Sequence, residues 1–149
     1  MKLSAPAKIL SLLAVIPIFL VILAGCSSSS SNQDNLAMAS MDGMPDEVKS
    51  APTVVQQAYQ FAAANPEVMK KIPCYCGCED IGHTSNYSCY ISGEDENGRV
   101  TYDSHALGCS ICVDITQDVM RLLKQGKPIP EIKTYIDQIY AQYGPSNMP

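Results

Sequence analysis

The stretch Pro73-Cys74-Tyr75-Cys76-Gly77-Cys78 places three cysteines at alternate positions within five residues. Further along the chain lie three more cysteines and both of its histidines: His83, Cys89, His105, Cys109 and Cys112. Thiolate and imidazole groups are ligands that soft and borderline metal ions prefer. The sequence therefore predicts a metal-binding site built around this stretch.

The alternate spacing favours metal binding over local cross-linking. Two cysteines separated by one residue rarely form a disulfide with each other, because the short ring conflicts with disulfide geometry. In an extended segment alternate side chains point the same way, so Cys74, Cys76 and Cys78 can share one face, and Gly77 lets the backbone turn around an ion. Close thiolates repel one another, and a cation removes that repulsion. This density favours bridging thiolates and more than one metal ion.

A second group of ligands is predicted on a long helix over residues 105–125. At about 100° per residue, Cys109 lies about 40° from His105 around the helix axis, and Cys112 lies about 20° to the other side. All three side chains would leave the first two turns in one narrow sector. A helix N-terminus also lowers thiol pKa values, so this face is predicted to supply the other half of the metal site.

The ordered motifs resemble one known family. The chain contains Pro73–Cys78 followed by Glu79-Asp80, Gly82-His83, Ser88-Cys89-Tyr90, His105-Ala106 and Gly108-Cys109-Ser110-Ile111-Cys112. This series, within roughly residues 52–143, resembles the PCYCGC-motif lipoproteins of Gram-positive bacteria. The resemblance implies a lipid-anchored, cysteine-rich, metal-binding domain, and it implies no particular reaction.

The N-terminus is typical of a lipoprotein signal peptide. Lys2 and Lys8 flank the start of an apolar run over residues 9–23, and Leu-Ala-Gly-Cys at 23–26 resembles a lipobox. We expect residues 1–25 to be removed and Cys26 to carry the lipid. The protein would then sit at the extracytoplasmic face of the cell membrane. The alternative is an uncleaved membrane anchor.

Charge argues against a nucleic-acid partner. The chain has ten basic residues, and loss of Lys2 and Lys8 leaves eight against fifteen acidic residues, a formal charge of −7. Such a surface lacks the basic patch that nucleic-acid binding requires.

Residues 26–49 are predicted to form a flexible, lipid-anchored linker, because a serine run and polar residues follow Cys26. Met38, Met41 and Met44 recur at every third position within it. Thioethers are soft donors that suit Cu(I), so these methionines are predicted auxiliary metal ligands. The alternative is three chance methionines in a linker.

The remaining chain, residues 50–149, is predicted to be a small, mainly α domain of about four helices with a cysteine-rich loop and one short β-hairpin. Apolar residues at helical spacing and capping signals mark the helices, and Asn97-Gly98 marks the hairpin turn. The expected helices span residues 51–64, 66–71, 105–125 and 131–143, and the expected strands span residues 88–92 and 99–102.

Several readings of the ligand set stay open at this stage. Cys109 and Cys112 could form a redox disulfide, Cys89 could form a disulfide with a loop cysteine, and His83 is the weaker histidine because its polar loop also suits solvent exposure. The leading hypothesis is a Cu(I) binder for copper buffering, delivery or resistance, with a multinuclear thiolate cluster and a copper transporter or cuproprotein as partner. Zn(II), Hg(II), an iron–sulfur or redox cluster, and three disulfides stapling an interaction domain are the alternatives. No catalytic constellation is recognised.

Overall fold

The structure is a computed structural model that describes residues 36–148. The predicted signal peptide (1–25), the lipid attachment at Cys26 and the serine run (27–31) lie outside the described residues. Within the described part, no helix has both the length and the apolar character needed to cross a membrane.

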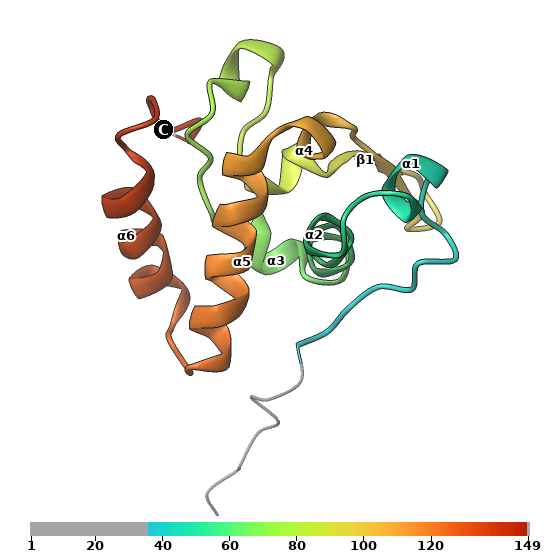
Figure 1. Ribbon diagram of the computed structural model, residues 1–149, viewed down its shortest axis with the longest axis horizontal. Helices are drawn as coiled ribbons and strands as arrows, with labels where there is room; N and C mark the ends of the chain where they lie inside the picture. Colours follow the sequence, from blue (N-terminus) through green and yellow to red (C-terminus); the bar gives the residue numbers. More distant parts are fainter. Residues whose placement is uncertain (1–35, 149) are drawn as a thin grey trace, which may run out of the picture. The chain divides into compact units, whose positions relative to one another are not determined.

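The fold is mainly α with one small antiparallel sheet, as the sequence predicted (Figure 1). Two 3-10 turns, η2 and η3, lie in the cysteine-rich region. In chain order the elements are α1 (Asp46–Lys49), α2 (Thr53–Ala64), α3 (Pro66–Met69), η2 (Cys78–Ile81), η3 (Asn86–Cys89), β1 (Ile91–Glu94), β2 (Val100–Tyr102), α4 (His105–Gly108), α5 (Ser110–Lys124) and α6 (Ile129–Tyr140).

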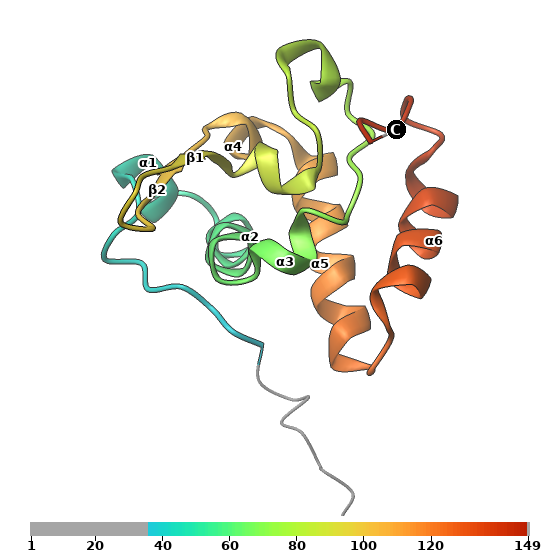
Figure 2. The same cartoon turned by 180° about the vertical axis from the view of Figure 1, so that it is seen from behind.

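Helix α5 is the centre of the hydrophobic core. It lies between α2 and α6 in both views (Figures 1 and 2), and it contacts both helices. Ile115 and Val119, four residues apart, lie on one face of the helix and are fully buried. The cysteine-rich loop passes the N-terminal end of α5, so the core fixes the position of that end relative to the loop.

The last helix differs from its predicted form. It ends at Tyr140, earlier than expected, and its buried stripe is Ile132, Ile136 and Tyr140. The helical spacing of apolar residues in the predicted helix 131–143 places Ile139 and Tyr143 on the same stripe, but both are exposed. Tyr143 is exposed because the helix stops at Tyr140 and the following residues leave it, whereas Ile139 lies within the helix on its exposed side.

The segment before α2 also differs from the predicted flexible linker. Residues 36–49 pack on the domain: Met44 is only 3% exposed, and Val48 on α1 is buried as well. The Ala39 N–H donates to the Gln60 carbonyl oxygen at 3.0 Å. No helical or strand periodicity marks residues 36–45, so only tertiary burial reveals that they belong to the domain.

The predicted hairpin is confirmed, with a shorter first strand. Strands β1 and β2 pair antiparallel, with Ile91 opposite Tyr102 and an irregularity before Gly93. Ser88 and Cys89, which were expected to begin the strand, belong to the 3-10 turn η3 instead. That turn brings Cys89 to a buried position beside the cysteine loop.

A matched pair of substitutions on α6 tests this core. Ile136 is fully buried, whereas Ile139 on the same helix is 42% exposed. We expect Ile136→Ala to lower the free energy of unfolding by about 2–5 kcal/mol, because it removes buried methyl groups and leaves a cavity. Ile139→Ala should change it by less than about 0.5 kcal/mol. Denaturant unfolding of the metal-free protein measures both, and equal losses would contradict this packing.

Candidate metal centre

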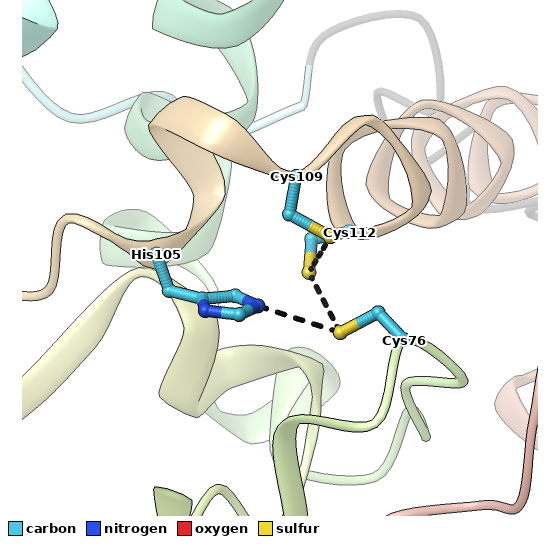
Figure 3. Close-up of side chains that lie close together, drawn as sticks. All are labelled: Cys76, His105, Cys109 and Cys112. Carbon is cyan, nitrogen blue, oxygen red and sulfur yellow. Dashed lines mark hydrogen bonds between the residues drawn. The ribbon is translucent and has the colours of Figure 1, made fainter.

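Three segments of the chain bring their cysteines together at the N-terminal end of α5. They are the loop over residues 73–78, the region from His83 to η3, and the junction of α4 and α5. All six cysteines within residues 36–148 are free thiols. Cys76 lies in hydrogen-bonding contact with a histidine as well as with thiols (Figure 3).

The predicted continuous helix over residues 105–125 is wrong. Cys109 has an extended backbone, with φ −119° and ψ 98°, and it separates α4 from α5. Gly108 precedes it, and glycine is a poor helix former. The break gives α5 its own N-terminus at Cys109, and the turn it makes still brings His105, Cys109 and Cys112 together.

The first cluster of ligand atoms combines Cys76 from the loop with His105, Cys109 and Cys112 (Figure 3). The Cys76 Sγ lies 3.4 Å from His105 Nε2 and 3.6 Å from Cys112 Sγ. The Cys112 and Cys109 sulfur atoms are 3.1 Å apart. All four ligand atoms lie within 4.8 Å of one another.

A second cluster lies deeper and contains Cys78, His83, Cys89 and His105, so His105 belongs to both clusters. The sulfur atoms of Cys78 and Cys89 are 3.7 Å apart, and both residues are buried. His83, the weaker candidate from sequence, is buried here rather than exposed in its polar loop.

Cys74 lies between the two clusters. Its Sγ is 3.4 Å from the sulfur atoms of both Cys76 and Cys112. It also lies within 4.8 Å of Cys78 and of Cys89, the two cysteines of the second cluster. Every cysteine and histidine that the sequence singled out in residues 73–112 is therefore part of one connected set of donors.

These spacings suit metal coordination. Ligand atoms at about 2.3 Å from a tetrahedral ion lie about 3.8 Å apart. The closest sulfur–sulfur and sulfur–nitrogen contacts among these donors run from 3.1 to 3.7 Å, and the ligand atoms within each group lie within 4.8 Å of one another. The donors need only small outward shifts to hold an ion, so these groups can bind metal. Their spacing does not select one metal over another.

The thiols divide into proton donors and acceptors. The Cys112 thiol donates to Cys109 and lowers the pKa of Cys109 to about 5. Hydrogen bonds from Cys112, Cys78 and Cys89 likewise hold the pKa of Cys74 well below its usual range. Hydrogen bonding to Cys109 and Cys74 raises the pKa of Cys112, and burial raises that of Cys76 to about 12. A cation can replace the shared protons, because metal ligation deprotonates thiols.

Asn147, near the C-terminus, holds the loop over residues 73–78 through three hydrogen bonds. Its Oδ1 accepts the Cys74 N–H at 2.7 Å, and its own N–H donates to the Cys74 carbonyl oxygen at 3.0 Å. Its Nδ2 donates to Cys78 Sγ at 3.4 Å. A Cβ on Gly144 would lie 3.2 Å from the Tyr75 carbonyl oxygen, so glycine suits this close approach of the two segments. Asn147 was not predicted as part of the site, because nothing in the residues after Gly144 indicates a contact with the cysteine loop.

A buried hydrogen-bond network supports the backbone of Cys112 in the first turn of α5. Tyr90 Oη lies 2.8 Å from both the Cys112 carbonyl oxygen and Thr116 Oγ1. Asn86 Nδ2 donates to Thr116 Oγ1 at 2.9 Å. These three side chains are fully buried, and they fix the first turn of α5 relative to η3. These three residues were not predicted as part of the site, because the contact between η3 and α5 forms only in the tertiary structure.

The three predicted auxiliary methionines are not gathered on one free segment. Met44 is buried in the core, and Met41 is half-buried against it. Met38 is exposed and lines a pocket with Gln117 and Arg121. These two residues of α5 lie after its first turn, and Cys112 lies in that first turn.

The family model described as "Protein of unknown function with PCYCGC motif" matches residues 12–149. The chain belongs to this family. The match includes every cysteine and histidine of the two clusters. No curated protein and no solved structure matches the chain.

Tyr90→Phe tests the network behind Cys112. The change keeps the ring and removes the hydroxyl group, which leaves buried partners short of one hydrogen bond. We expect the free energy of unfolding of the metal-free protein to fall by about 1–3 kcal/mol. Tyr143→Phe is the control, because Tyr143 is exposed and should lose less than about 0.5 kcal/mol. Equal effects in denaturant unfolding would show that the Tyr90 hydroxyl does not stabilise the site.

Proposed function

We propose that this protein is a lipid-anchored, extracytoplasmic Cu(I)-binding protein that buffers copper, delivers it or confers resistance to it. The observation that carries the proposal is the contact of six free thiols from three segments, with two histidines beside them. Thiols that meet several partners at once are arranged for an ion rather than for pairwise cross-links.

The choice of copper rests on ligand chemistry. Thiolates are soft ligands, and soft ligands suit Cu(I). Sulfur donors outnumber the histidines by six to two in the combined set. Zn(II) or Hg(II) can occupy the same donors, and a copper transporter or a cuproprotein is the partner that delivery would require.

The location rests on the sequence of residues 1–26 alone. The apolar run and the Leu-Ala-Gly-Cys ending support a signal peptide and a lipid on Cys26. A fixed lipid would hold the metal centre near the outer surface of the membrane, where a copper transporter could exchange ions with it.

Elemental analysis with thiol titration tests the proposal directly. The full chain is purified in detergent, without oxygen and without added metal. We expect more than one equivalent of copper, and six free thiols after denaturation without reductant if Cys26 carries lipid. Iron together with acid-labile sulfide would show that the site holds a redox cluster instead of copper. Absence of both metal and free thiols would indicate a disulfide scaffold and overturn the proposal.

The methionine segment gives a second test. Met38→Leu with Met41→Leu keeps side-chain volume and removes two thioethers. If these sulfurs capture the ion first, Cu(I) loading should slow several-fold, while the final copper content stays unchanged. Met69→Leu is the control, because Met69 is buried in the core. Stopped-flow loading from a Cu(I) chelate measures the rates, and equal rates in all three proteins would remove the capture role.

A further inference from the structure

His83 is buried without a partner for one of its ring nitrogens. Its side chain is about nine-tenths buried, with the residue only 8% exposed. Its Nδ1 has no hydrogen-bond partner among the described residues. A buried polar atom without a hydrogen-bond partner lowers stability, so this nitrogen is a candidate atom for binding a metal ion. The His83 side chain belongs to the group formed with Cys78, Cys89 and His105.

The other ring nitrogen of His83 faces a carboxylate. His83 Nε2 lies 3.6 Å from Asp103 Oδ2. Asp103 Oδ1 in turn accepts the backbone N–H of His105 at 2.7 Å. One carboxylate thus faces the side chain of one histidine and fixes the backbone of the other. Metal-binding histidines commonly donate their second N–H to a carboxylate, which fixes the tautomer and the ring orientation.

The groups of donors overlap, because His105 lies within 4.8 Å of the Cys76 group and also of Cys78, His83 and Cys89, so we assign each of the eight donors to one of two sets of four. Cys76, Cys109, Cys112 and His105 form the first set, since His105 Nε2 contacts Cys76. The remaining donors are Cys78, Cys89, His83 and Cys74. Cys74 groups with both Cys78 and Cys89. Four donors satisfy one tetrahedral ion.

We propose that the centre holds two metal ions in unlike positions, and that His83 binds the inner ion through Nδ1 while Asp103 positions its ring. The outer position, at the junction of α4 and α5, takes three thiolates and His105. The inner position takes Cys74, Cys78, Cys89 and His83. This inference rests on the proposed metal-binding function and adds the number of ions and the ligands of each.

Burial separates the two positions. Cys74, Cys78, Cys89 and His83 are all buried, whereas Cys76, His105 and Cys109 in the outer set are only partly buried. An ion in the outer position can therefore be reached by a competing thiol or chelator more readily than one in the inner position. The outer ion is the one that exchanges, and the inner ion is the one that is retained.

Cadmium NMR of the full chain tests the proposal. ¹¹³Cd(II) is the probe because it binds thiolates and reports each ion separately. We expect two ¹¹³Cd resonances of equal intensity, one correlated with protons of Cys76 and Cys109, the other with protons of Cys78 and His83. Long-range ¹H–¹⁵N spectra should show His83 protonated at Nε2 and bound through Nδ1.

Paired variants assign each resonance. His83→Ala should remove or shift only the inner resonance, and Cys109→Ser only the outer one. The retained resonance also shows that each variant is folded. Asp103→Asn should shift the inner resonance and weaken the inner site about 10–100-fold, while Asp46→Asn, a change at an exposed carboxylate, should alter neither.

The outcomes separate this inference from the function on which it rests. One resonance at saturation, or an inner resonance unchanged in His83→Ala, would overturn the two-position proposal and leave metal binding intact. No bound cadmium and no bound Cu(I) would overturn the metal-binding function itself. If the spectra show that His83 binds the ion through Nε2 instead of Nδ1, the positioning role proposed for Asp103 is overturned.

Discussion

The metal centre depends on how the loop over residues 73–78 is held between two other parts of the chain. On one side the Cys74 sulfur contacts Cys112 in the first turn of α5. On the other, three hydrogen bonds from Asn147 fix the Cys74 backbone and reach Cys78. Neither support is local in sequence, so the site forms only when the helical core is assembled. Metal binding and folding should therefore be linked, as they are wherever ligands are distant in the chain.

The ligand types were predictable, but their geometry was not. Alternate spacing identified Cys74, Cys76 and Cys78 as a group, because side-chain direction in an extended segment follows from the backbone alone. The face formed by His105, Cys109 and Cys112 was derived from a continuous helix, and the break at Cys109 removes that derivation. The three residues still meet, because α4 and α5 join at the donor set. Helical periodicity cannot reveal such a break when the residues on both sides are helical.

Contacts that form only in the tertiary structure could not be predicted from the sequence for the same reason. Asp103 accepts the His105 N–H two residues along the chain, but its approach to His83 depends on two segments folding together. Met44 illustrates the opposite error. Its polar, glycine-containing surroundings indicated a flexible linker, yet the residue is buried in the core. Mainly α character was predictable because the buried stripes of α2 and α5 follow helical spacing.

The position of Asn147 has a consequence for how the chain matures. A protein is made from its N-terminus onward, so all six thiols of the centre emerge before the residue that fastens their loop. Until Asn147 arrives, Cys74 and Cys78 lack three of the hydrogen bonds that hold them in the finished site. During that interval the nascent thiols are open to oxidation and to wrong pairing. Because of this order of synthesis, early binding of a cation, or a helper protein that keeps the thiols reduced, would protect the thiols before the fold is complete.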